Sequence, residues 1–500
     1  MPRSPNILIF VTDQQRADTI ARLGNPIIRT PVLDRLSAEG VTFTRAYSPS
    51  PVCVPARCAL ATGQHPAQSE CWDNMDMPNT ASYMEILQRQ GFQTHGIGKM
   101  HFMPDHEKMW GFESRDISEE GKPGDFINHV RAAGFGHVLA PHGLRSEHYY
   151  APQPSQLPAH LHESHWVADR SIDFLQKRDR NRPFLLNCHF IKPHPPFENP
   201  TPWSYIYRTD EMPPPYVPEN CDDFLTRVNQ LQNRFKYKDR SRFDDLGWRT
   251  LKAAYYGAIS FIDYQVGRVL EALGDELDNT LVIFTSDHGE MMGDYGCAGK
   301  RCMLEASARI PLIARLPRGE LAGKRVSTAV SLIDIFPTVT QLGGASAEST
   351  GETPGSSLVD IAHGAEPDRV VFSQFQAKWM GHYMATDGRT KFVHSAADQK
   401  SWTYSIDEDL TEQNLDLDAG RSMESAALEH FGQFPATEAV ENGTWKKHDV
   451  PAWPSDPNYG LLRQDPDGLD EMLAQIGPYA PPANENAEDG LKAIFDHQPK

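Results

Sequence analysis

The sequence lacks an excess of basic residues. Lys and Arg together number 48, against 67 Asp and Glu, so the formal net charge is −19 at pH 7. A nucleic-acid-binding protein normally carries a basic face, and this balance therefore argues against a nucleic-acid partner. A small basic pocket for an anion stays possible, because such a pocket needs only a few residues.

Long apolar runs and a cysteine framework are also missing. The apolar run at 7–12 ends at Asp13 and is too short for a membrane span or a signal peptide. The cysteines are odd in number and scattered, at positions 53, 58, 71, 188, 221, 297 and 302. Such a set is typical of a reduced, intracellular chain. We therefore expect a cytoplasmic protein with no membrane partner.

Strand-like and helix-like segments alternate along the first two thirds of the chain. Apolar runs predict strands at 6–12, 92–102, 182–190 and 279–289, and helical periodicity predicts helices at 30–40, 80–91, 164–178 and 251–274. This alternation predicts an α/β fold in which a large mixed, mostly parallel sheet is sandwiched by helices. Residues 103–160 and 198–248 are expected to be long functional insertions.

The remainder of the chain changes character. Short runs separated by turns predict a smaller C-terminal subdomain built on a short antiparallel sheet. The last part is acidic and rich in proline. We therefore expect a large N-terminal domain at 1–360, a C-terminal antiparallel-sheet subdomain at 361–435 and a tail at 436–500.

Two predicted strands end in polar pairs. Asp13 and Gln14 follow the first strand, and Asp287 and His288 follow a later one. In parallel α/β sheets, ligands bind beyond the carboxyl ends of the strands. Two carboxylates, an amide and an imidazole at one edge suit a hard divalent cation. The alternative is that both pairs are ordinary strand-end turns.

The stretch SPSPVCVPARCALATGQ, residues 48–64, places Cys53 ahead of Pro55 and Arg57. The cysteine could be a nucleophile, a metal ligand or a packing residue. Pro55 is suited to the first turn of a helix. An anion held at Cys53 would then face free backbone N–H groups and the positive end of a helix dipole.

The run C-V-P-A-R-C-A-L-A-T-G resembles the sulfatase signature C-x-P-[S/A]-R-x-x-x-x-T-G. The segments DQQRAD, GKMH (98–101), KPHPPF (192–197), TSDHGE (285–290) and GK (299–300) fall in the order and spacing of type I sulfatases, of the alkaline phosphatase superfamily. The resemblance covers about residues 5–415. The pairs Asp-Gln and Asp-His resemble the branch that contains choline sulfatases and phosphonate monoester hydrolases, whereas G-K-M-H-F is sulfatase-like.

This resemblance implies a nucleophile and a metal. Cys53 would be oxidised to formylglycine by a formylglycine-generating enzyme, and its hydrate would attack the ester. One divalent metal would be held by the set Asp13, Gln14, Cys53, Asp287 and His288. Calcium is the expected ion, and manganese and magnesium are the alternatives because the Asp-Gln and Asp-His pairs carry less negative charge than the paired acids of many sulfatases.

The resemblance also implies roles for residues around the sulfate. Arg57 would hold the hydrate, Lys99 would contact sulfate and His101 the hydrate. His194 would face the leaving-group oxygen, and Lys300 would bridge sulfate and that oxygen. Asn74 would contact the substrate. Because Lys99 and His101 lie two apart on the predicted strand 92–102, they are expected on one face of it.

The resulting hypothesis is a sulfatase that hydrolyses a sulfate monoester to an alcohol and inorganic sulfate. A phosphonate monoester or phosphodiester hydrolase of the same superfamily is the alternative, and a non-catalytic anion-binding member is a third. The expected partners are a small-molecule or saccharide sulfate ester and further copies of the chain in a homo-oligomer. Candidates for an aromatic substrate wall, each of which could equally be packing, are Trp72, Trp110, Tyr149, Tyr150, Trp203 and Trp379.

Overall fold

A large sheet forms the centre of the computed structural model, which describes residues 4–145, 149–219, 221–226, 229, 244–351, 353–406, 412 and 420–450. Its eight strands lie in the order β12 (Arg325–Val326), β2 (Val41–Phe43), β11 (Leu312–Arg315), β9 (Thr280–Ser286), β1 (Asn6–Asp13), β7 (Phe184–Pro193), β4 (Gln93–Gly98) and β5 (Ser114–Ile117). Strands β9, β1, β7, β4 and β5 run parallel, and β11 runs antiparallel to both of its neighbours.

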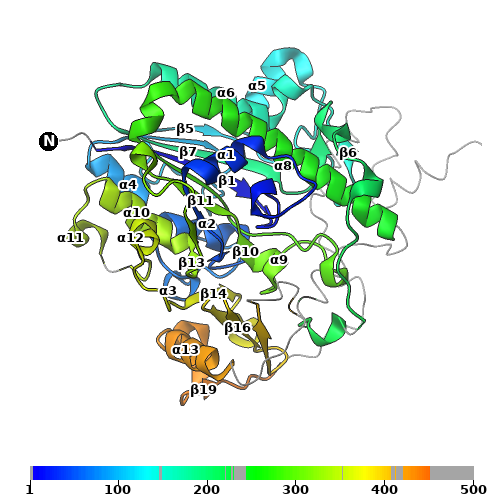
Figure 1. Cartoon of the computed structure of the whole chain (residues 1–500), viewed down its shortest axis with the longest axis vertical. Coiled ribbons are helices and arrows are strands. Elements are labelled where there is room, and N and C mark those ends of the chain that lie inside the picture. Colours follow the sequence, from blue (N-terminus) through cyan, green and yellow to red (C-terminus); the bar gives the residue numbers. More distant parts are fainter. Residues whose placement is uncertain are drawn as a thin grey trace, which may run out of the picture.

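Helices cover both faces of this sheet (Figure 1). One face carries α1 (Pro31–Glu39), α5 (Asp125–Val130), α6 (Glu163–Lys177) and α8 (Asp245–Leu273), and the other carries α2 (Cys53–Thr62), α4 (Tyr83–Arg89), α10 (Ile335–Leu342) and α12 (Leu358–His363). Leu8 and Phe10 of β1 pack with the first set, and Ile7 and Ile9 with the second. A strand buried on both faces needs such a continuous apolar run, and the predicted sandwich is confirmed.

Shorter elements complete the body of the molecule. They are the helices α3 (Pro66–Ser69), α9 (Glu305–Ala308) and α11 (Ala347–Thr350), the three-stranded sheet of β10 (Arg309–Ile310), β3 (Ala46–Tyr47) and β13 (Val330–Ser331), and the pair β6 (Gln153–Pro154) and β8 (Glu198–Asn199). The three-stranded sheet lies beside α9, at the side of the body that faces the C-terminal part.

The C-terminal part contains the predicted small antiparallel sheet. Strands β14 (Val371–Phe375), β15 (His382–Thr386), β16 (Thr390–Ser395) and β17 (Lys400–Ser405) pair in sequence order, and α13 (Gly420–Gly432) packs on β15 and β16. A hairpin, β18 (Val440–Glu441) and β19 (Thr444–Trp445), follows. Residues 451–500 of the expected tail lie outside the described residues, and the domain boundaries stay a prediction.

Two segments differ from their predicted bounds. The long helix α8 begins at Asp245 rather than at 251, because the Asp244 side chain accepts a hydrogen bond from the backbone of Gly247 at 2.8 Å and caps the helix. The predicted strand 92–102 is wrong at its end, since β4 stops at Gly98. Gly98 has a φ of +85°, and a Cβ atom there would stand 1.9 Å from the carbonyl oxygen of His189.

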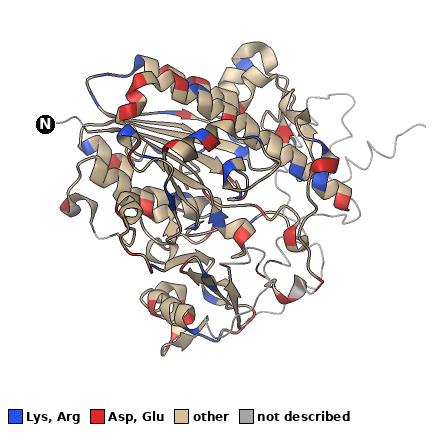
Figure 2. Cartoon of the chain, viewed as in Figure 1, with Lys and Arg blue, Asp and Glu red and all other residues tan. Residues whose placement is uncertain are grey.

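Charged residues are interspersed along the described part of the chain (Figure 2). On α6 and α8, for example, ion pairs join residues one turn apart, as between Arg249 and Asp245 at 2.7 Å. Such exposed pairs contribute little to stability. Among the described residues, no helix is both long enough and apolar enough to cross a bilayer.

Candidate active site

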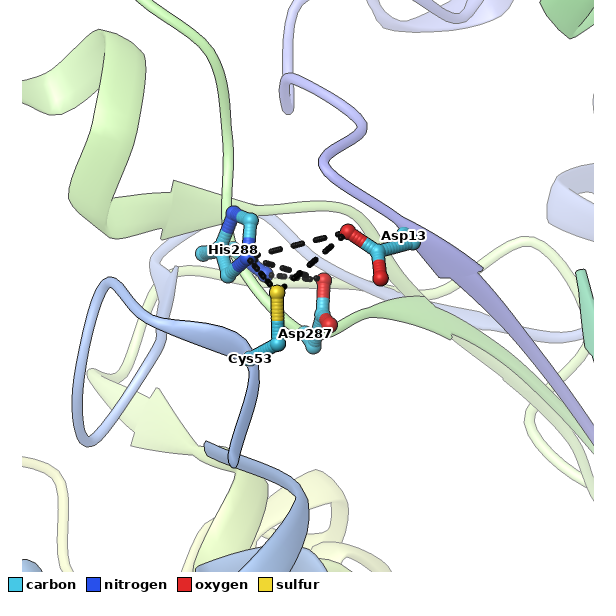
Figure 3. Close-up of side chains that lie close together, drawn as sticks. All are labelled: Asp13, Cys53, Asp287 and His288. Atoms are coloured by element: carbon cyan, nitrogen blue, oxygen red, sulfur yellow. Dashed lines mark hydrogen bonds and ion pairs between the residues drawn. The ribbon is translucent and has the colours of Figure 1, made fainter. Parts of the chain in front are cut away.

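The carboxyl ends of two neighbouring strands bring the polar pairs together. Strands β1 and β9 are parallel, with Thr12 opposite Ser286, so the chain leaves both strands at one edge of the sheet. One ligand atom from each of four buried residues, Asp13, Cys53, Asp287 and His288, lies within 4.8 Å of the others. Figure 3 shows these side chains converging from β1, from the loop after β9 and from the start of α2.

Arg57 orients the two carboxylates of this cluster. Its Nε donates to Asp287 Oδ2 at 2.9 Å and its Nη2 to Asp13 Oδ2 at 3.2 Å. Both Oδ1 atoms lie on the side of His288 Nε2, and that of Asp287 also accepts the backbone N–H groups of Gln14 and His288. Arg57 is fully buried, and its remaining donors reach the carbonyl oxygen of Lys99 and the ring of His189. The guanidinium therefore sits behind the acids and fixes their geometry, a position that the sequence did not reveal.

The charges around Asp13 keep it ionised. Burial alone would raise the pKa of this carboxyl, but the ammonium groups of Lys99 and Lys300 lower it to about 2. The Lys99 ammonium lies 2.5 Å from Asp13 Oδ2. An ionised carboxylate is the form that binds a cation.

The donor set fits a divalent cation. His288 donates from Nδ1 to the carbonyl oxygen of Gly289 at 3.0 Å, which leaves the Nε2 lone pair facing the cluster. Gln14 donates its amide N–H to Glu290, and its Oε1 is buried without a hydrogen-bond partner among the described residues. A buried oxygen without a partner is costly unless something binds it. Oxygen donors and one imidazole are the expected ligands of a hard or borderline cation.

Cys53 is the first residue of α2, and Pro55 lies in the first turn of this helix, as its residue type predicted. Its sulfur lies 2.8 Å from Lys300 Nζ, 3.4 Å from His288 Nε2 and 3.8 Å from Asp13 Oδ1. Burial would raise the pKa of this thiol, but the charges of Lys300 and Lys99 hold the pKa well below its usual range. The site therefore favours negative charge on the group at position 53.

Lys99 and His101 follow β4 in a loop rather than lying on it, so the argument from strand alternation was wrong. They nevertheless line the same cavity as Cys53. Lys99 is buried, and its ammonium bonds both Asp13 and Glu120. His101 has a φ of +54° and contributes a hydrogen bond to Cys53.

His194 lines the same cavity as Cys53. Its Nδ1 donates to the carbonyl oxygen of Pro195 at 2.7 Å, and the Tyr149 hydroxyl lies 3.4 Å from its Nε2. Burial lowers the pKa of His194 to about 4, although Glu120 acts in the opposite direction. The imidazole is therefore neutral near pH 7, with its Nε2 free of a proton.

These groups share one cavity of about 460 Å³. Of the predicted site residues, it is lined by Gln14, Cys53, Asn74, Lys99, His101, His194 and Lys300. Asn74 Oδ1 accepts a hydrogen bond from the Val54 backbone at 3.2 Å. Of the aromatic candidates, Tyr149 and Tyr150 line the cavity. Trp110 instead packs on Phe102 in the core, and Trp203 on α8.

A comparison with known protein families shows which family the chain belongs to. A family model described as Sulfatase matches residues 5–345, which is more than half of the chain. The chain belongs to the sulfatase family. That family lies in the alkaline phosphatase superfamily, as the signature at 53–63 predicted.

Individual relatives agree with this assignment. The chain is 32% identical to an arylsulfatase of Clostridium perfringens over 389 residues, which are 71% of this chain and 78% of the relative. It is 28% identical to a choline-sulfatase of Rhizobium meliloti over 79% of each chain. The crystal structure of a phosphonate monoester hydrolase of Agrobacterium radiobacter superposes with a TM-score of 0.75 at 25% identity, over 86% of this chain and 95% of that one.

This member of the family has further site residues that the sequence did not identify. Glu119 and Glu120 lie in the segment 103–160, which was expected to be a functional insertion. Glu119 Oε1 accepts the backbone N–H groups of Met100 and His101, at 2.9 and 2.8 Å, and so holds the loop that carries Lys99. Arg145 joins Glu120 in the cavity. No motif marks these residues, and only their placement in an insertion hinted at a role.

Proposed function

We propose that the protein hydrolyses a sulfate monoester to an alcohol and inorganic sulfate. The observation that carries this proposal is the position of Cys53 at the start of α2, with its sulfur between the Asp13–Asp287–His288 cluster and the ammonium of Lys300. An anion at this point meets helix N–H groups and fixed cations. The cavity supplies these groups in a buried place, where their charges act strongly.

The proposal includes the modification of Cys53. We propose that a formylglycine-generating enzyme converts it to formylglycine, whose hydrate would supply a hydroxyl nucleophile. The surroundings fit a negatively charged oxygen at this position. Lys300 and His101 both reach the present sulfur, and the two carboxylates beyond it are paired with Arg57.

We further propose that one divalent cation binds here. The proposed ligands are Asp13, Gln14, Asp287, His288 and the modified side chain at 53. The cation would act as a Lewis acid on the oxygens that bind it. Calcium fits the four oxygen donors of this set, whereas the imidazole of His288 also suits manganese.

The chain's own groups then divide the remaining work. Lys99 and Lys300 would stabilise the negative charge of the transferring group. Arg57 would hold the two aspartates in the orientation that faces the site. His101, which reaches residue 53, would accept a proton from it, and His194 would deliver one to the leaving oxygen. Since His194 is neutral in the resting protein, it must take up that proton at Nε2 before or as the substrate binds.

A phosphonate monoester or phosphodiester hydrolase is the second candidate. The observation that favours it is the structural similarity to the phosphonate monoester hydrolase of Agrobacterium radiobacter. Sulfate and phosphonate monoesters each carry one negative charge and have similar tetrahedral shapes, so one cavity could hold either. The cytoplasmic location and the homo-oligomeric state expected from the sequence stay predictions.

The deciding experiment compares two substrates with one leaving group. We expect the purified enzyme to release 4-nitrophenol from 4-nitrophenyl sulfate with a higher kcat/KM than from 4-nitrophenyl methylphosphonate. A panel of alkyl and saccharide sulfates, read out by sulfate release, would then identify the alcohol. The Cys53→Ala variant is the control for contaminating hydrolases. If the enzyme hydrolysed the phosphonate but none of the sulfate esters, the second candidate function, a phosphonate monoester or phosphodiester hydrolase, would be the correct one.

A further inference from the structure

A carboxylate stands among the cationic groups of the cavity. Glu120 Oε1 bonds the Lys99 ammonium and lies 3.2 Å from His194 Nδ1, and Glu120 Oε2 lies 2.8 Å from Arg145 Nη1. The side chain is 12% exposed and lines the same cavity as Cys53. A negative charge beside an anion-binding site opposes anion binding, so its presence there calls for a reason.

The contacts of Lys99 show what Glu120 changes. The Lys99 side chain is 2% exposed, and its ammonium is shared between Asp13 and Glu120. Two carboxylates therefore already neutralise this cation before a substrate arrives. Glu120 also pairs with Arg145, so its single negative charge offsets part of the charge of both cations. The positive charge left for the transferred group is smaller than the number of lysines and arginines in the cavity suggests.

We propose that Glu120 tunes the site to esters whose transferred group carries one negative charge, and discriminates against those that carry two. This inference rests on the proposed function and extends it to the choice between sulfate and phosphate. A sulfate monoester has a charge of −1, whereas a phosphate monoester is largely −2 at pH 8, because its second pKa is about 6. Each extra charge on the substrate is repelled by Glu120, and specificity often depends on such a repulsive element.

The test uses three substrates with one leaving group: 4-nitrophenyl sulfate (−1), methylphosphonate (−1) and phosphate (−2), at pH 8. Each hydrolysis consumes one water, breaks the bond from sulfur or phosphorus to the phenolic oxygen, and releases 4-nitrophenol. The Glu120→Gln variant keeps the shape of the side chain and removes its charge. We expect it to raise the kcat/KM ratio of phosphate to sulfate about tenfold, and to leave the ratio of phosphonate to sulfate within about twofold.

The ratios separate charge selection from a structural role. A variant that folds poorly or loses metal loses activity on all three esters, and its ratios stay constant. Glu113→Gln is the matched control, because Glu113 lies in the same segment but pairs with Arg182 at the surface. Arg145→Gln removes the opposite charge from the same pair, so it should lower the ratio of phosphate to sulfate. Inhibition of sulfate hydrolysis by phenyl phosphate gives the same comparison where phosphate turnover is slow.

The test distinguishes a failure of charge selection by Glu120 from a failure of the proposed sulfatase function. An unchanged ratio of phosphate to sulfate in both Glu120→Gln and Arg145→Gln would overturn charge selection while leaving the sulfatase assignment intact. A parallel rise for phosphate and phosphonate would also overturn it, because the effect would then follow the phosphorus atom rather than the charge. Failure of the wild type to hydrolyse any sulfate would contradict the proposed function itself.

Discussion

The ammonium nitrogen of Lys300 lies 2.8 Å from the sulfur of Cys53, although 247 residues separate the two in the chain. The GK segment that carries Lys300 follows β9, and Cys53 begins α2. Their contact places a fixed positive charge against the proposed nucleophile. Together with Lys99 it holds the pKa of the thiol well below its usual range, against the effect of burial.

The first prediction concerns the chemical state of residue 53. We expect mass spectrometry of the peptide that spans it to show an aldehyde, or its hydrate, in active enzyme. Cys53→Ala should abolish turnover, and Cys53→Ser should be nearly as damaging because serine offers one hydroxyl where a hydrate offers two. Full activity in a preparation that contains only the intact thiol would contradict the proposed nucleophile.

A second prediction concerns the metal. Gln14→Ala removes a buried oxygen that has no hydrogen-bond partner among the described residues, and leaves the pairing of Arg57 with the aspartates intact. We expect it to lower metal occupancy, measured by elemental analysis, and to reduce kcat/KM by roughly 10²-fold or more. Asp287→Ala should remove both metal and activity. The control is Asp278→Asn, since Asp278 is 82% exposed near the start of β9. Normal turnover by chelated, metal-free enzyme would exclude this scheme.

The sequence predicted the parts of the site that motifs and strand ends carry. Asp13 and Asp287 could be placed together because parallel strands end at one edge, and the signature located Cys53. The position of Arg57 behind the aspartates could not be predicted, since the signature identifies the residue type and not the direction of its side chain. Glu120 could not be found either, because its role depends on a loop that folds over Lys99 from a segment without periodicity.

The errors in the predicted fold have similar causes. The predicted strand 92–102 included Lys99 because the residue pattern is compatible with a strand up to that point. In the structure, β4 ends at Gly98, which has a positive φ. Local pattern does not reveal that the backbone of His189 leaves no room for a side chain there. Strand β1 was predicted correctly because its apolar run at 7–12 is typical of a buried strand, and all eight of its residues are buried.

A third prediction concerns stability and pH. Burial raises the pKa of Glu163, the first residue of α6, to about 8. The folded protein therefore binds this proton more tightly than the unfolded chain does, and the contribution of Glu163 to stability falls as pH rises from about 4.5 to about 8. We expect Glu163→Gln to be more stable than the wild type at pH 9, by roughly 1–3 kcal/mol, and the difference to shrink towards pH 5.

Denaturant unfolding at pH 5, 7 and 9 measures this difference. Glu271→Gln on the exposed side of α8 is the control, and its difference from the wild type should not vary with pH. A pH-independent difference for Glu163→Gln would mean that the carboxyl is ionised in the folded protein. The hydrogen bonds that it accepts from the Ile191 backbone and from Ser164 Oγ would then outweigh the effect of burial.

The last prediction concerns His194 as the acid that protonates the leaving group. Proton transfer matters most when the departing alkoxide is strongly basic. His194→Ala should therefore reduce kcat/KM by roughly 10²-fold or more for alkyl or saccharide sulfates, and by much less for 4-nitrophenyl sulfate. Metal content should not change, because His194 contacts Pro195, Tyr149 and Glu120 rather than the cluster.

The neutral state of His194 in the resting protein leaves Lys300 as a second possible source of the proton. With a pKa of about 4 its imidazole is neutral near pH 7, so it can act as an acid only if the anionic substrate raises its proton affinity. Lys300 lines the same cavity and is the alternative proton donor. If the loss in His194→Ala is equal across leaving groups of rising pKa, while Lys300→Met shows the steep dependence, the proton comes from Lys300 and His194 only binds the substrate. If His194→Ala loses metal, the ligand set proposed above is incomplete.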